Sequence, residues 1–101
     1  MNRIAFFSER NLPLEYKLVE SGIIIHEGDA ASNGDLTLDK SGILRSVSTS
    51  HGNAGQFVVR KANVSDNETW SARAYMTYKD STGSLCTIYS NVVSETYTNG
   101  Q

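Results

Sequence analysis

Residues 70–93, WSARAYMTYKDSTGSLCTIYSNVV, decide the fold of this chain. Apolar and polar side chains alternate along its first run, which stops at a turn and resumes as a second β-rich run. The alternation places on one face Trp70, Ala72, Ala74, Met76 and Tyr78, and on the other Ser71, Arg73, Tyr75, Thr77 and Lys79. A period of two is typical of an antiparallel sheet with one buried and one wet face. The segment therefore predicts a hairpin in which Trp70 faces the core and Tyr75 faces solvent.

The size and composition of the chain fit a single globular domain. It has 101 residues, of which 39% are hydrophobic and 20% charged, values that argue against disorder. A chain of this length buries enough surface to fold without a disulfide or a metal, and its single cysteine, Cys86, is expected to be a small packing residue. We expect one β-sandwich domain over residues 1–101, excised from a longer chain.

The charge pattern and the apolar runs exclude two classes of partner. The formal net charge is −2 with mixed signs, and no basic stripe is available to bind a phosphate backbone, so we expect no nucleic acid. The longest apolar run, 22–25, is far below the roughly 20 residues that a membrane-spanning helix needs. The opening MNRIAFF is not a signal peptide. The protein is then either intracellular or, as we favour, part of an exported parent chain.

Further β-strands are expected before this hairpin, at 3–7, 14–25, 36–38, 43–48 and 56–62. Gly22, inside the second of these, predicts a bulge or close packing. Polar stretches at 27–35 and 49–55 predict loops, and 63–68 predicts a corner. The best candidate helix, 8–19, has Pro13 at its centre, which costs about 3 kcal/mol there. The regular spacing of about seven short strands is typical of a β-sandwich or a barrel.

The segment 64–74, VSDNETWSARA, resembles the closing part of a fibronectin type III domain, and 73–93 resembles its last two strands. The same stretch is similar to immunoglobulin-like modules of multidomain surface proteins of Gram-positive bacteria, in which a glycine followed by an apolar run, here 22–25, precedes an Arg-Ala-Tyr strand. This resemblance implies an all-β, immunoglobulin-like or fibronectin III-like antiparallel β-sandwich of about seven strands. It also implies a secreted or cell-surface location.

The residues that could carry chemistry do not form a recognisable catalytic or metal motif. His26 and His51 lack zinc-site spacing, and Cys86 lacks a nucleophile's surroundings. The acidic side chains most open to a role in hydrolysis, Asp66, Glu68 and Asp80, lie in predicted turns. We expect no catalytic residues, no cofactor and no metal, so the protein is predicted not to be an enzyme.

One loop is a candidate calcium site. Asp29, Asn33, Gly34 and Asp35 supply oxygen ligands, but Ala31 and Lys40 break the EF-hand pattern. A solvated turn is the alternative interpretation.

Three residues are the candidate interaction surface: Arg73, Tyr75 and Tyr89. Such residues anchor interfaces, although cross-strand packing would also explain them. The predicted function is a non-catalytic spacer or an interaction and adhesion domain of a bacterial surface protein. Its partners would be neighbouring domains of the parent chain and a protein or glycan ligand. The alternatives are a carbohydrate-binding accessory domain of a polysaccharide-degrading enzyme, which needs Tyr75, Tyr89 and Tyr97 coplanar and accessible, and a phage or virion structural domain.

Overall fold

The computed structural model describes residues 3–48 and 54–98, which form seven strands and no helix. The strands are β1 (Arg3–Asn11), β2 (Lys17–Glu27), β3 (Leu44–Val47), β4 (Ala54–Ala62), β5 (Thr69–Lys79), β6 (Leu85–Tyr89) and β7 (Val93–Thr96). They build a two-stranded sheet, β1–β4, and a five-stranded sheet in the order β3-β2-β5, with β6 and β7 following one another along the free edge of β5. Every pairing is antiparallel. The predicted all-β antiparallel class is confirmed.

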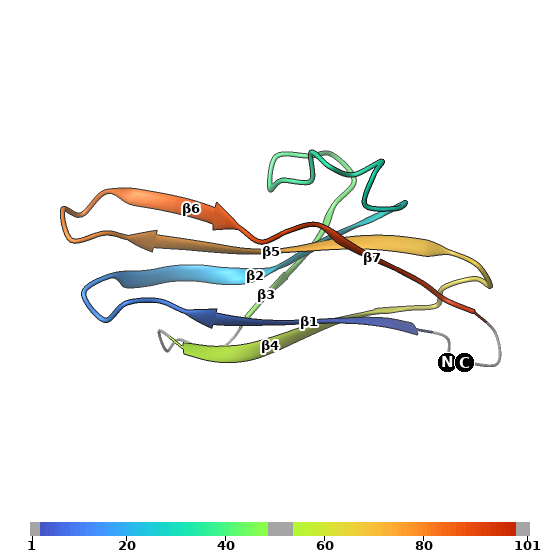
Figure 1. Ribbon diagram of the computed structural model, residues 1–101, viewed down its shortest axis with the longest axis horizontal. Coiled ribbons are helices and arrows are strands. Elements are labelled where there is room, and N and C mark those ends of the chain that lie inside the picture. Colours follow the sequence, from blue (N-terminus) through green and yellow to red (C-terminus); the bar gives the residue numbers. More distant parts are fainter. Residues whose placement is uncertain (1–2, 49–53, 99–101) are drawn as a thin grey trace.

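The fold has three layers in a body of 49 × 23 × 17 Å. The five-stranded sheet lies in the middle, the β1–β4 sheet covers one face, and the loop 28–43 covers the other (Figure 1). We call the β1–β4 side the core face of the large sheet and the opposite side the loop face. This third layer explains why Tyr75 and residues 36–38 differ from the sequence prediction.

Trp70 anchors the core between the two sheets. Its side chain is 8% exposed and packs with Ile4, Phe6, Ile23, Ile25, Val64 and Ala72. Its indole N–H donates to Oε2 of Glu68 at 2.6 Å, and the ammonium of Lys61 lies 5.1 Å from its ring centroid. The prediction that Trp70 faces inward is confirmed.

A second cluster lies on the loop face. Ile24, Leu36 and Tyr75 are buried there, with Leu38, Ile43, Tyr89 and Val92 packed around them. Because successive side chains of a strand point to opposite faces, the run Ile23, Ile24 and Ile25 can be fully buried only if both faces of β2 are covered. The prediction that Tyr75 points into solvent is therefore wrong, since its exposed fraction is 2%.

Several predicted boundaries change. Residues 36–38 are not a strand, because Leu36 and Leu38 instead carry the covering loop onto the sheet. The polar residues 8–11 continue β1 rather than end it, since Arg10 turns inward and its Nη1 donates to Ser21 Oγ at 3.3 Å. Of the predicted loop 49–55, residues 49–53 lie outside the described residues, and the rest belongs to β4.

Two local predictions have a physical basis in the structure. Gly22 marks close packing: a Cβ atom there would overlap the carbonyl oxygen of Ser46 and lie 3.0 Å from the Tyr75 hydroxyl. The irregularity in the β2–β5 register falls earlier, between Leu18 and Glu20. The corner at 63–68 turns through Asn63 and Asn67, whose φ values are 59° and 66°. Asparagine tolerates this left-handed conformation better than most residues do.

Candidate functional site

The structure brings Arg73, Tyr75 and Tyr89 together, but beneath the loop 28–43 rather than on an open surface. Arg73 donates from Nε to the Ser90 carbonyl at 2.6 Å and from Nη1 to the Leu36 carbonyl at 3.0 Å. Its guanidinium stacks over the Tyr89 ring, with 4.9 Å to the centroid. The Tyr89 hydroxyl accepts from the Leu38 amide at 3.3 Å. These residues hold the covering loop on the sheet.

Tyr75 extends this cluster to β2 and β3. Its hydroxyl donates to Oε2 of Glu20 at 2.6 Å and accepts from Nε of Arg45 at 3.1 Å, and Arg45 also pairs with Glu20. The hydrogen bonds from Tyr75 and Arg45 hold the pKa of Glu20 below its ordinary value. Burial, followed by the bond to Glu20, raises the pKa of Tyr75. The three polar groups satisfy one another, so the cluster joins three strands.

The oxygen-rich loop at 29–35 uses its polar groups within the fold. The Asn33 amide donates to the carbonyls of Glu27 and Asp29, each at 3.2 Å, and to Ser71 Oγ at 3.3 Å. Asp29 caps the Ser32 amide at 2.8 Å, and Asp35 pairs with Lys40 at 3.0 Å. Within the described ranges, no group of three His, Cys, Asp or Glu side chains is placed to hold a metal ion.

The remaining candidate residues are dispersed. His26 lies at the end of β2, its Nδ1 2.7 Å from the Glu27 carbonyl oxygen, whereas His51 falls outside the described residues. Cys86 is half-buried opposite Tyr78 on β5. No helix in the described part of the chain is long and apolar enough to cross a membrane.

The three tyrosines required for a sugar-stacking platform do not share a surface. Tyr75 and Tyr89 belong to the cluster on the loop face, where Tyr75 is buried. Tyr97 packs against the Trp70 cluster on the core face. They therefore cannot present coplanar rings to one glycan.

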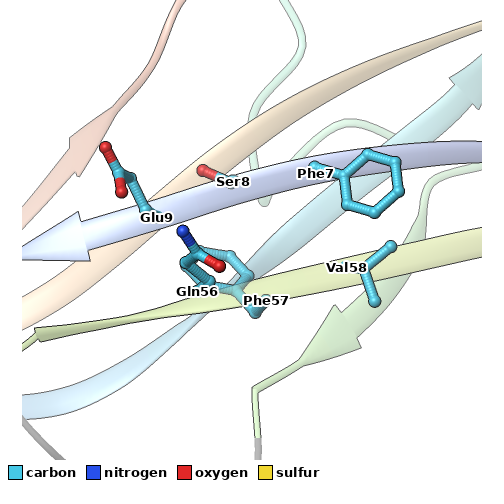
Figure 2. A pocket seen from close by; sticks show the side chains of 6 residues that line it. All are labelled: Phe7, Ser8, Glu9, Gln56, Phe57 and Val58. Atoms are coloured by element: carbon cyan, nitrogen blue, oxygen red, sulfur yellow. The ribbon is translucent and has the colours of Figure 1, made fainter.

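An exposed apolar surface lies on the β1–β4 sheet, which the sequence prediction did not single out. Phe6 and Phe7 are consecutive, so their rings point to opposite faces: Phe6 is buried in the core, and Phe7 is 77% exposed. Phe7 pairs with Val58 across the two strands, and Figure 2 shows these side chains next to each other. They line a hollow of about 590 Å³ together with Ser8, Glu9, Gln56 and Phe57. The adjacent phenylalanines were the available sequence signal.

The second edge of β1 is also open, because no strand among the described residues pairs with it. Three hollows of about 280, 260 and 200 Å³ follow β1 from Arg3 to Asn11 and are bounded on the far side by residues 88–98 of the β6–β7 edge. Ile88 pairs with Met76 and Val93 with Ala72, which places both on the core face of the large sheet. They are nevertheless 48% and 52% exposed, since the β1–β4 sheet is too narrow to cover them.

No family model, no curated protein and no solved structure matches this chain.

Proposed function

We propose that the chain is a non-catalytic interaction module that binds another protein through the β1–β4 sheet. The observation that carries this proposal is the exposed ring of Phe7 beside Val58, on a two-stranded sheet with an open edge. Large aromatic side chains exposed within an apolar surface are typical anchors of protein interfaces. Of the two predicted roles, spacer and interaction domain, this surface supports the second.

The surrounding structure supports a rigid presentation of this surface. Phe6 fixes β1 to the core directly behind Phe7, so the exposed ring stands on a packed strand rather than on a loop. A side chain held in this way loses little conformational entropy on binding. The β1–β4 sheet can therefore act as a preorganised docking surface.

The finer assignment belongs to the same proposal. An immunoglobulin-like or fibronectin III-like topology, in a secreted or cell-surface bacterial protein, rests on the resemblance of 64–74 and on the β5–β6 hairpin that follows. We propose no glycan ligand, because Tyr75, Tyr89 and Tyr97 do not form a stacking platform.

A photo-cross-linking experiment tests the interaction surface. The variant Phe7→benzoylphenylalanine is irradiated in an extract of the producing cells, with Leu14→benzoylphenylalanine as the matched control. Leu14 is even more exposed, at 91%, but lies in the β1–β2 connection, away from the hollow. We expect a discrete adduct from position 7 alone, and competition by the unmodified protein but not by Phe7→Ser. Equal adducts from both positions, or none from position 7, would overturn the proposal.

A further inference from the structure

We propose that the groove between β1 and the β6–β7 edge accepts one extended segment of another protein, which adds to β1 as an antiparallel strand. This inference rests on the proposed function and names a second, more specific contact of the same sheet. Strand addition to an open edge is a recurrent mode of peptide recognition, in which backbone hydrogen bonds supply affinity and side-chain pockets supply specificity.

At the β6–β7 edge, the five-stranded sheet is wider than the β1–β4 sheet by about one strand. β1 packs over β5, and β4 over β2, so β6 and β7 extend beyond β1. A strand paired with the open edge of β1 would lie above β6 and β7. It would cover Ile88 and Val93, which are half-exposed although they lie on the core face. The added strand therefore completes the hydrophobic layer at the place where it is incomplete.

The three hollows lie on the side of β1 where the inward side chains of a paired strand would project. They follow one another along the nine residues of β1, and inward side chains of a paired strand recur at every second residue, about 7 Å apart. The hollows beside Ile88 and Val93 suit small aliphatic side chains. The third hollow is bounded by Glu95 and Thr96 and suits a polar one.

The charges on β1 specify the order of the charged residues along the partner segment. Arg3 and Glu9 are exposed on the outer face of β1, near opposite ends of the edge, and no ion pair within the described ranges engages either of them. An antiparallel strand complements them with a basic residue near its start, opposite Glu9, and an acidic residue six positions later, opposite Arg3. The expected segment thus has a base, alternating apolar residues and then an acid.

A second copy of the chain carries the same charge order on its own β1, but its large sheet does not fit. If the β1 strands of two copies paired about a two-fold axis, the second β1 would lie above β6 and β7 of the first copy. Because β1 packs over β5, the β5 strand of the second copy would then overlap with those strands. A lone extended segment carries no such second layer. For this reason we commit to a segment of another protein.

The probe is the blocked peptide Lys-Val-Thr-Val-Thr-Thr-Glu, titrated into the intact protein and followed by amide NMR. The control peptide exchanges only the terminal lysine and glutamate. We expect shifts in β1 and at Ile88 and Val93, and a preference for the first peptide of about 1.5- to 5-fold for each ion pair. In the double variant Arg3→Glu/Glu9→Lys, the preference between the two peptides should invert.

A pair of variants on β6 tests the floor of the groove. Ile88→Ser should weaken binding of the first peptide by roughly fourfold or more, the equivalent of one buried methylene group. Leu85→Ser is the control, because Leu85 is 64% exposed on the same strand but pairs with Lys79 on the loop face. The Leu85 variant should bind as the parent protein does.

The outcomes separate this inference from the proposed function. The absence of shifts in β1, equal affinity for the two peptides, or equal effects of Ile88→Ser and Leu85→Ser would overturn strand addition. A homodimer by light scattering, with β1 amides protected without peptide, would also overturn it and identify a second copy as the occupant. If these results occurred while position 7 still cross-linked specifically, only the strand-addition proposal would fail. Loss of the cross-link alone would refute binding through the outer surface around Phe7 and would leave the strand-addition proposal standing.

Discussion

The hydroxyl of Tyr75 donates a hydrogen bond to Oε2 of Glu20 at a distance of 2.6 Å, although 55 positions separate the two residues. Between them, on the same face of β2, lies Gly22, whose missing side chain leaves room for the phenol ring. Arg45 of β3 completes the cluster by contacting both partners. The loop face of the large sheet is thus held by a specific polar arrangement as well as by apolar packing.

This arrangement predicts a pH-dependent effect of Tyr75→Phe. The pKa of Glu20 is lowered in the folded protein, chiefly by Tyr75, so its contribution to stability is present above the unfolded pKa and lost as the pH falls through the folded pKa. The free energy of unfolding should fall by about 1 kcal/mol at pH 6. The difference from the parent should narrow below about pH 4, near the ordinary pKa of glutamate. Urea unfolding of the parent and the variant, at pH 6 and below about pH 4, measures this difference in the free energy of unfolding.

The control for this prediction is Tyr89→Phe. The Tyr89 hydroxyl accepts from a backbone amide and is not bonded to a carboxylate, so its loss should be the same at both pH values. A difference between Tyr75→Phe and the parent that stayed constant from neutral to acidic pH would contradict the role assigned to Glu20.

Gly22→Ala should destabilise the protein by about 1–3 kcal/mol, because the new methyl group meets a backbone carbonyl that cannot move independently of β3. Gly34→Ala is the matched control: its Cβ would find its nearest neighbour, the carbonyl oxygen of Ala31, at 4.0 Å, and the change should be below about 1 kcal/mol. Chemical denaturation followed by circular dichroism compares them. Equal midpoints for the two variants would show that β2 and β3 do not approach as closely as described.

Arg73→Lys should loosen the covering loop without unfolding the sheet. Lysine cannot reproduce the two diverging hydrogen bonds to Ser90 and Leu36, and the loss should be about 1.5–3 kcal/mol, local to the loop. Hydrogen exchange at the Leu38 amide, which bonds to Tyr89, reports the opening. Arg60→Lys, on the exposed side of β4, should leave that exchange rate unchanged.

Trp70→Ala should cost about 3–5 kcal/mol, a large part of the stability of a domain of this size. Trp70→Phe keeps an aromatic ring but loses the hydrogen bond to Glu68, and it should cost less. Urea unfolding by circular dichroism ranks the parent, Trp70→Phe and Trp70→Ala in that order. A Trp70→Ala protein as stable as its parent would refute the central position of this residue.

The final hairpin was predictable because both of its strands are contiguous in sequence and one face is continuously apolar. The inward position of Trp70 followed from the same period of two. The error at Tyr75 has a specific cause: alternation shows that two faces differ, but not that the less apolar face is uncovered. The three consecutive isoleucines at 23–25 were the signal that the prediction did not use, because they can all be buried only if both faces of the sheet are covered.

The covering loop escaped prediction because it is fixed by contacts rather than by a repeat. Its polar first half resembles a solvated turn, yet Asn33 is buried and Leu36 is fully buried. These positions depend on Ser71, Arg73 and Tyr89, more than thirty residues away in sequence, so no local pattern encodes them. The open edge of β1 was equally hidden, because pairing partners are a property of the assembled sheet.

The pairing scheme also has a kinetic consequence. Among the strands of the described ranges, only β5 and β6 form a tight hairpin. Arg3 must pair with Ala62, and Lys17 with Lys79, before the two sheets are complete. Bringing the ends of such long segments together is entropically unfavourable until packing of the core compensates for the lost entropy. This topology therefore predicts folding on the millisecond-to-second scale. During that interval the chain is exposed to misassembly, and β1, which like its partner β4 keeps an edge that no described strand pairs with in the folded protein, would stay exposed to it afterwards.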